Sequence, residues 1–371
     1  MIRADIAVIG AGMAGASIAA ELALHARVVL IEAESQPGYH STGRSAAFWS
    51  ETYGGPAVQP LTTASGPWLA APPPDFSDRA FLSPRGALHI AGPEGSAPLE
   101  ALRQDFIGSD VVLTPVDRAG LEHVLPGLRP GWESGLAEPS CADIDVAALH
   151  AAYLGAAKRS GATLLCNAAV TGLERGAGGW RIATRAGAIE AALVVNAAGA
   201  WAGQVAEMAN ATRFAITPYR RTIVQLAVDP GASADLPLIV DAEERFYFKP
   251  EAGGRLWLSP HDETPVMPGD AAAEELDVAI AIARLEEVVD WRILRRERAW
   301  AGLRSFAPDR APVYGFDARA PGFFWFAGQG GFGIQTAPAA ALIGAALLLD
   351  RPLPDPVRTI DAARYSPTRF S

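Results

Sequence analysis

The sequence predicts a protein that combines an α/β domain with a second, strand-rich domain. Three stretches each read as an apolar strand, a turn of small residues and a helix: residues 4–34, 191–201 and 322–338. The chain between them holds further short apolar runs typical of strands. A chain of 371 residues is too long for one compact core, so two interlocked domains are expected.

The first stretch, ADIAVIGAGMAGASIAAELALHARVVLIEAE, predicts a dinucleotide site. An apolar strand without polar alternation is followed directly by Gly10, Gly12 and Gly15 in a GxGxxG pattern. The first glycine permits the tight turn, the second lets backbone approach a pyrophosphate, and the third lets the helix pack closely on the sheet. Glu32 closes the next strand, where an acidic side chain binds ribose hydroxyls. The motif does not choose between NAD and FAD.

The other two stretches repeat this pattern. AALVVNAAGAW (191–201) predicts a strand and a small-residue turn, with a helix starting near Trp201. GFFWFAGQGGFGIQTAP (322–338) predicts a strand, a glycine turn and a helix beginning near 331–335, with Pro338 tolerated in its first turn. Such a helix would direct its positive end toward whatever precedes it.

Composition excludes several classes of protein. The net charge of −10 and the absence of a basic stripe argue against nucleic-acid binding. Two cysteines, Cys141 and Cys166, and six scattered histidines favour neither a disulfide framework nor a metal site. No signal-peptide pattern is present, and the longest apolar run, 337–349, is too short for a membrane span. We therefore expect no metal, no transmembrane segment and a cytoplasmic location.

Seven motifs spread along the chain resemble one family. QPGYHSTGRSAA, ADIDVAALH, VVNAAGAW, RRT, FYFKP, WAGLRSF and QGGFGIQT are similar to the FAD-dependent amine and D-amino-acid oxidoreductases, the group of glycine oxidase, sarcosine oxidase and D-amino-acid oxidase, and most resemble the bacterial D-arginine dehydrogenases. The resemblance implies FAD as the cofactor. It also implies a Rossmann-type FAD domain joined to an antiparallel-sheet substrate domain.

The resemblance implies a set of FAD-contacting residues. The segment STGRSAA (41–47) is expected to run along the pyrophosphate, ribityl chain and flavin, where large side chains would collide with the cofactor. The full set expected to bind FAD is Gly10, Gly12, Ala14, Gly15, Glu32, Ser41, Thr42, Arg44, Ser45, Ala46, Ala47, Val170, Ala198, Gly199, Trp201, Arg304, Gly330, Gly331, Phe332, Gly333, Ile334 and Gln335. Because neither cysteine falls in these motifs, we expect FAD to be bound without a covalent link.

A substrate oxidised at its α-carbon needs its carboxylate clamped, and guanidinium forks match carboxylate oxygens. Arg221 and Arg304 are the candidates; a structural salt bridge is the alternative, and the resemblance favours the clamp. Arg220 is the weaker choice, since neighbours along a strand point to opposite faces. Tyr247 is expected to hydrogen-bond the substrate carboxylate or close over the ring, and Tyr53 to lie on a short loop softened by two glycines. Neither tyrosine is needed as a strong base.

The resemblance also indicates a substrate pocket formed by Phe48, Trp49, Ala87 and Gly330, with core packing an equal alternative for Trp49. In the D-arginine dehydrogenase pattern a glutamate and a histidine occupy the positions of Ala87 and Phe48. Without that carboxylate a cationic side chain would be buried unpaired. We therefore expect neutral, apolar D-amino acids to be preferred.

The breaker APPPDF (71–76) and the order of strands and helices predict a discontinuous architecture. We expect residues 1–80, 141–212 and 302–371 to form the FAD-binding domain, and residues 81–140 and 213–301 the substrate domain.

The expected reaction is oxidative deamination of a D-amino acid, with hydride passing from Cα to flavin N5 and the imino acid hydrolysing to a 2-oxo acid and ammonia. In sarcosine-oxidase-like relatives a lysine above the flavin promotes oxygen reduction, and Trp257 stands at that position here. Lys158 and Lys249 are the only lysines, and neither is expected above the flavin. We therefore expect a non-oxygen acceptor such as a quinone or dye. The alternatives are a 2-hydroxy-acid or secondary-amine dehydrogenase or oxidase of the same fold, and a non-enzymatic flavin-binding sensor.

Overall fold

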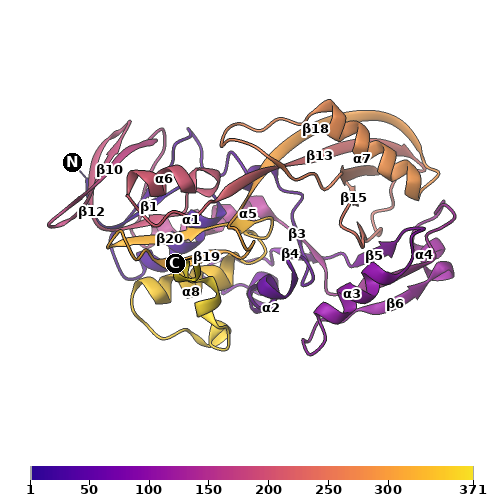
Figure 1. Cartoon of the computed structure of the whole chain (residues 1–371), viewed down its shortest axis with the longest axis horizontal. Helices are drawn as coiled ribbons and strands as arrows, with labels where there is room; N and C mark the ends of the chain where they lie inside the picture. Colours follow the sequence, from indigo (N-terminus) through magenta and orange to yellow (C-terminus); the bar gives the residue numbers. More distant parts are fainter. Residues whose placement is uncertain (1, 371) are drawn as a thin grey trace.

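The computed structural model describes residues 2–370 as an elongated molecule built on three β-sheets. The first sheet, with helices α1 (Met13–Ala23), α6 (Ala202–Met208) and α8 (Ala337–Leu348), forms one end (Figure 1). The long strands β13 (Thr217–Asp229) and β18 (Arg292–Phe306), covered by α7 (Glu275–Val288), extend to the other end.

The first sheet contains the expected parallel core. Its strands are β1 (Ile2–Ile9), β2 (Val28–Ile31), β9 (Thr163–Leu165), β10 (Val170–Gly176), β11 (Gly179–Thr184), β12 (Gly187–Asn196), β19 (Val313–Phe316) and β20 (Phe323–Ala327). Strands β9, β2, β1, β12 and β20 are parallel, and the other pairings are antiparallel. Every residue of β2 and β20 is buried, as the unbroken apolar runs predicted.

Helices cover both faces of this sheet, because alternate side chains of each strand point to opposite faces. Ile6 and Val8 belong to the core formed with α1, α5 (Val146–Arg159) and α8. Ala7 and Ile9 belong to the core on the α6 side. The GxGxxG turn lies between β1 and α1, so the predicted strand–turn–helix–strand unit is confirmed.

The second sheet is larger. Its strands follow the order β21 (Gln329–Gly330), β18, β13, β16 (Arg255–Ser259), β15 (Tyr247–Glu251), β14 (Leu238–Asp241), β5 (Ala87–Ala91), β7 (Ser134–Glu138) and β6 (Thr114–Asp117), with β17 (Thr264–Pro265) on β13. All pairs are antiparallel except β14–β5, which is parallel. The expected antiparallel sheet is therefore confirmed, with one parallel pair within it. The two strands come from different excursions of the chain and are not joined by a hairpin.

Short elements connect the two large sheets. A three-stranded sheet is formed by β3 (Phe48–Trp49), β8 (Ala142–Ile144) and β4 (Leu82–Pro84). Helix α2 (Gly55–Ala70) follows β3 and ends at the predicted breaker, while α3 (Ala97–Asp105) and α4 (Arg118–Val124) pack near β5, β6 and β7. The remaining helical turns are 3₁₀ segments: Thr42–Arg44, Gly199–Trp201, Asp355–Val357, Ala362–Tyr365 and Pro367–Phe370. None of the helices described between residues 2 and 370 combines the length and hydrophobicity needed to cross a bilayer.

Residues 81–140 and 213–301 contribute most strands of the second large sheet. Strand β18 runs through the boundary drawn at residue 302, and β21 adds residues 329–330 to the second sheet. The exact domain limits therefore stay a prediction.

Candidate active site

A cavity of about 500 Å³ lies at the carboxyl ends of the parallel strands and reaches the second sheet. This is where open α/β sheets bind ligands. Eighteen of the residues expected to bind FAD line it: Gly10, Gly12, Ala14, Glu32, Ser41, Thr42, Arg44, Ser45, Ala46, Val170, Ala198, Gly199, Trp201, Arg304, Gly330, Gly331, Gly333 and Ile334. Gly15, Ala47, Phe332 and Gln335 are not among its lining residues.

The glycines of the first motif have the roles that the pattern predicts. Gly10 has φ +98°, and a Cβ atom there would lie 2.4 Å from the carbonyl oxygen of Ala197. On Gly15 it would lie 1.8 Å from the carbonyl oxygen of Gly10. Gly15 therefore packs the helix on the turn instead of lining the cavity, while Gly10 and Gly12 leave backbone exposed for a pyrophosphate.

Backbone hydrogen bonds orient Glu32, the residue predicted to bind ribose, at the cavity. Its carboxylate accepts the backbone N–H groups of Ala11 and Glu34, both at 2.9 Å. Two donors leave lone pairs free on a carboxylate that lines the cavity. A dinucleotide fits these residues: a glycine cradle, an oriented acid and a long groove between them.

Segment 41–47 forms one wall of the cavity, and the charge of Arg44 is paired there. The guanidinium of Arg44 pairs with Asp270 and donates to the carbonyl oxygens of Ala271 (2.7 Å) and Ala301 (3.2 Å). Together with the carbonyl oxygen of Tyr39 (3.3 Å), these groups occupy most of its donors, so the side chain joins the cofactor segment to the second sheet. Arg44 lines the cavity, so its contact with FAD stays a prediction, although its charge is paired with Asp270.

Two further residues of the cofactor set lie behind the wall. The Gln335 side chain is buried and donates to the carbonyl oxygens of Ser50 and Tyr53 at 3.2 Å. Phe332 packs against the rings of Tyr53 and Phe306. Helix α8 begins at Ala337, slightly later than predicted, with Pro338 in its first turn.

The two predicted clamp arginines both line the cavity, together with Tyr247. Arg221 donates through Nε to the carbonyl oxygen of Asp262 (2.8 Å) and through one terminal nitrogen to Glu263 (3.0 Å). Its other terminal nitrogen is buried without a partner, and so is the Tyr247 hydroxyl. The guanidinium of Arg304 lies 5.5 Å from the centre of the Tyr53 ring. The cavity thus presents unsatisfied donors beside two cations, an arrangement suited to a carboxylate.

Electrostatics supports the same interpretation. Burial and the neighbouring Arg304 lower the pKa of Arg221 to about 10. Burial raises the pKa of the Tyr53 hydroxyl, although both arginines oppose this shift. Tyr53 therefore keeps its proton at neutral pH and can donate a hydrogen bond, in agreement with the view that it is no strong base.

Arg220 behaves as strand alternation predicts. It forms ion pairs with Glu274 and, at 2.8 Å, with Asp277, away from the cavity. The same alternation separates Tyr247 from Phe246 and Phe248, which pack in the core of the second sheet.

Only one residue of the predicted substrate pocket, Gly330, lines the cavity. Phe48 packs against the rings of Tyr53 and Tyr247, at centroid distances of 5.3 and 5.6 Å. Ala87 is buried in the apolar cluster that contains Phe48 and Tyr247. Phe48 and Ala87 therefore pack behind Tyr53 and Tyr247 and do not line the cavity. Trp49 is corrected to core packing: its indole is buried under α2 and donates to the carbonyl oxygen of Thr62 (3.0 Å).

His261 lies at the site although the sequence gave no signal for it. Its ring centroid lies 5.8 Å from that of Tyr247, Nδ1 contacts the carbonyl oxygen of Glu244, and φ is +55°. Burial and the charges of Arg221 and Arg304 hold the pKa of His261 well below its usual value, so the imidazole is neutral. A single histidine in a polar loop after a strand matches no sequence motif, so sequence reasoning did not find it.

Both lysines lie away from the cavity wall. Lys158 lies on α5. Lys249 lies in the middle of β15, and its buried Nζ pairs with Asp143 at 2.5 Å, 5.5 Å from the Trp257 ring. Its charge is thus already neutralised.

Comparison with known proteins establishes the class. Residues 5–347 match the sequence profile of the family described as FAD dependent oxidoreductase (DAO). The chain therefore belongs to this family, and its cofactor is FAD.

Particular relatives are distant in sequence. The hydrogen cyanide synthase subunit HcnC of Pseudomonas aeruginosa is 28% identical over 220 residues, which cover 58% of this chain and 51% of that protein. The chain thus matches about half the length of this curated relative. Glycine oxidase from Geobacillus kaustophilus superposes with a TM-score of 0.86 at 22% identity, covering 100% of this chain and 99% of that one. L-amino acid deaminase from Proteus vulgaris gives 0.80 at 17%, covering 99% and 97%. These structures share the fold.

Proposed function

We propose that this chain oxidatively deaminates a D-amino acid with a neutral side chain and passes the electrons to an acceptor other than oxygen. The observation that carries the proposal is the pair of unpaired donors, an Arg221 nitrogen and the Tyr247 hydroxyl, beside Arg304 in the cofactor cavity. Amino acids are the substrates named for the superposed glycine oxidase and L-amino acid deaminase. The D configuration rests on the resemblance to the D-arginine dehydrogenases, so both enantiomers belong in the test.

The residues of the chain bind and orient the substrate. Arg221 and Arg304 hold the carboxylate, and Tyr247 donates to one of its oxygens. This fixes the α-carbon, since a clamped carboxylate leaves little rotational freedom. FAD, when bound, accepts the hydride that leaves Cα. The substrate ammonium group must first lose a proton to water. Loss of hydride from Cα then gives an imino acid, which water hydrolyses to a 2-oxo acid and ammonia.

The apolar cluster of Phe48 and Ala87, which packs behind Tyr247 at the cavity, supports a neutral substrate side chain. Both residues belong to an apolar cluster, and Glu138, which pairs with Ala87 across β5 and β7, already accepts several hydrogen bonds. A cationic side chain would therefore lose its hydration without gaining a free carboxylate.

Two features favour a dehydrogenase. Asp143 pairs with Lys249, and the resemblance implies that Trp257 stands where oxidase-like relatives carry a lysine. The second candidate is oxidation of a 2-hydroxy acid or a secondary amine, which would use the same carboxylate clamp. A sensor without activity has no need for the unpaired donors.

Anaerobic titration of the FAD-loaded protein tests the proposal. We expect a neutral D-amino acid such as D-Leu, D-Met or D-Phe to bleach the flavin absorbance, with the 2-oxo acid and ammonia as products. Bleaching by 2-hydroxy acids alone would favour the second candidate. No bleaching by any amino acid of either configuration would refute the proposal.

A further inference from the structure

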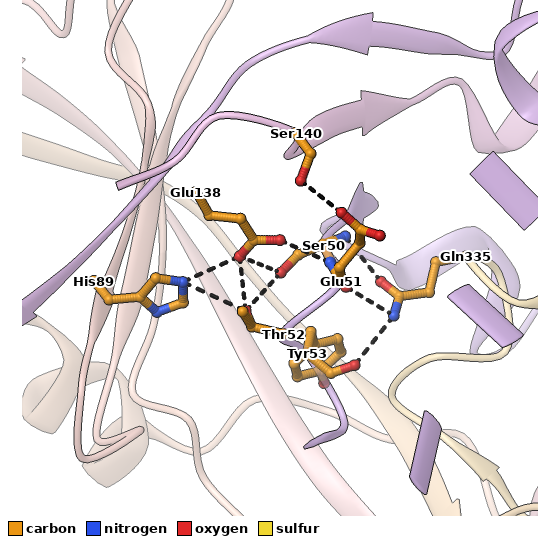
Figure 2. Close-up of polar contacts among 8 residues, drawn as sticks. All are labelled: Ser50, Glu51, Thr52, Tyr53, His89, Glu138, Ser140 and Gln335. Carbon is orange, nitrogen blue, oxygen red and sulfur yellow. Dashed lines mark hydrogen bonds and ion pairs between the residues drawn. The ribbon is translucent and has the colours of Figure 1, made fainter. Parts of the chain in front are cut away.

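The segment that leads into Tyr53 is held by one buried carboxylate. Glu138, at the end of β7, has no exposed surface. One of its oxygens accepts the backbone N–H of Glu51 at 2.7 Å, and the other accepts the hydroxyls of Thr52 (2.7 Å) and Ser50 (3.0 Å). Figure 2 shows these contacts converging on the carboxylate, with His89 on the opposite side at 3.1 Å.

Further contacts fix the same segment from other elements. The Gln335 amide accepts the Ser50 N–H and donates to the carbonyl oxygens of Ser50 and Tyr53, all at 3.2 Å (Figure 2). The Glu51 carboxylate accepts the hydroxyls of Ser140 (2.9 Å) and Thr63 (2.5 Å). Residues 50–53 are therefore bound by the second sheet, by α2 and by the turn before α8. Whether Gly54 and Gly55 let the loop after this segment move stays a prediction.

Tyr53 has little freedom once this segment is fixed. Its ring lies between Phe48 (5.3 Å) and Phe332 (5.6 Å) and under the guanidinium of Arg304 (5.5 Å). A Cβ atom on Gly331 would lie 2.0 Å from the Tyr53 hydroxyl, so this hydroxyl rests directly on the glycine wall of the cavity. Any shift of residues 50–52 moves Tyr53 relative to Arg304.

The anionic form of Glu138 is the one that fits. Burial alone would raise its pKa, but the hydrogen bonds from His89, Thr52 and the Glu51 backbone outweigh this effect and leave the pKa below its usual value. A protonated carboxyl would have one oxygen fewer to accept these hydrogen bonds.

We propose that Glu138 is a positioning residue: its carboxylate holds residues 50–52, and through them places the Tyr53 hydroxyl beside Arg304 for binding of the substrate carboxylate. This proposal rests on the proposed function in that it assigns Tyr53 to the carboxylate site. Glu138 itself touches neither the cavity nor the reacting atoms.

The test is a double-mutant cycle between Glu138→Gln and Tyr53→Phe. Glutamine keeps the shape of the Glu138 side chain, but its NH₂ group replaces one of the two carboxylate oxygens that accept hydrogen bonds from residues 50–52. We expect E138Q to raise KM for the amino acid tenfold or more and to change kcat less than threefold. In the Tyr53→Phe background the same substitution should change KM less than threefold, because the hydroxyl that it displaces is absent.

A second readout needs no turnover. The dissociation constant of benzoate, measured through the flavin spectrum, should rise in E138Q by a factor similar to that of KM. If wild type binds benzoate but oxidises no amino acid, the proposed function fails, and the benzoate cycle still decides the role of Glu138.

The matched control is Asp241→Asn. Asp241 is a fully buried carboxylate in the same sheet, but it pairs with Arg245 and does not contact residues 50–53. Its substitution should leave KM and benzoate binding unchanged. If E138Q does not fold, Thr52→Val removes the 2.7 Å donor with little change of shape and should raise both constants severalfold. The proposal is overturned if a folded, FAD-loaded E138Q or T52V keeps wild-type constants, or if the effects of E138Q and Y53F multiply.

Discussion

Arg221→Met is expected to stabilise the protein when no carboxylate is bound. Arg221 is 3% exposed, faces a second cation, and has one terminal nitrogen without a partner. The charge of Arg221 is suited to binding a carboxylate ligand. In the ligand-free protein, the loss of hydration around this charge lowers the stability of the folded state. Removal of the charge should therefore relieve a penalty in the folded state.

The pKa of Arg221 gives the magnitude. Burial and Arg304 lower it from 12.5 to about 10, and one unit corresponds to about 1.4 kcal/mol, so the shift amounts to about 3 kcal/mol. The unfolded chain binds this proton more tightly than the folded chain. The penalty is thus fully present below pH 10 and disappears as the pH rises toward 12.5. Methionine also forfeits the contacts with Asp262 and Glu263, so we expect a net gain of about 1–3 kcal/mol.

Denaturant unfolding at neutral pH, with and without benzoate, measures the effect. At one benzoate concentration, the free energy of unfolding should rise more for wild type than for Arg221→Met, because the variant binds carboxylates more weakly. Arg220→Met is the control: it is the next residue on the same strand, but it pairs with Glu274 and Asp277, so its loss should destabilise the protein. A ligand-free Arg221→Met protein less stable than wild type by more than 1 kcal/mol would refute the reasoning.

Four further predictions concern chemistry. Replacing Arg221 or Arg304 with Met should raise KM for amino acids about ten- to a hundredfold while FAD stays bound. Steady-state kinetics together with flavin quantification measure both effects. Unchanged kinetics in both variants would rule out the carboxylate clamp. In a dye-coupled panel, D-Leu, D-Met or D-Phe should show higher kcat/KM than D-Arg or D-Lys, and a lead for D-Arg would disprove the reading of Phe48 and Ala87. Acid precipitation should release the yellow colour into the supernatant, since neither cysteine lines the cavity in the part of the chain that the structure describes; colour in the pellet would contradict this. Without an added acceptor, turnover should release little peroxide, whereas rapid stoichiometric peroxide would show an oxidase.

The sequence predicts best where a repeating geometry links neighbouring residues. GxGxxG fixes a turn that only glycines can make, and the turn of Gly10 is confirmed by its φ of +98°. Alternation along β13 and β15 assigns Arg220 and Arg221, and likewise Phe246 and Tyr247, to opposite faces. Both are local rules, so no knowledge of partners is needed.

The sequence does not predict the position of a side chain when a residue far away in the sequence determines it. Strand β3 has two residues, too few for alternation to tell which ring enters a pocket, and the space beside Gly66 on α2 takes Trp49. Arg44 sits in a motif of cofactor contacts, but Asp270 attracts its charge. His261 and Glu138 belong to no motif at all. Their roles follow from what the sheets bring next to them.

The hydrogen bonds that fix residues 50–53 also imply that the substrate pocket forms late in folding. Ser50 lies 88 positions before Glu138 and 285 positions before Gln335. During synthesis the early segment must wait for almost the entire chain before its last polar partners exist. Contacts of such wide sequence separation carry a high loop-closure cost and form late. The glycine cradle can therefore take shape while the chain is still emerging, but the substrate site can be completed only after residue 335.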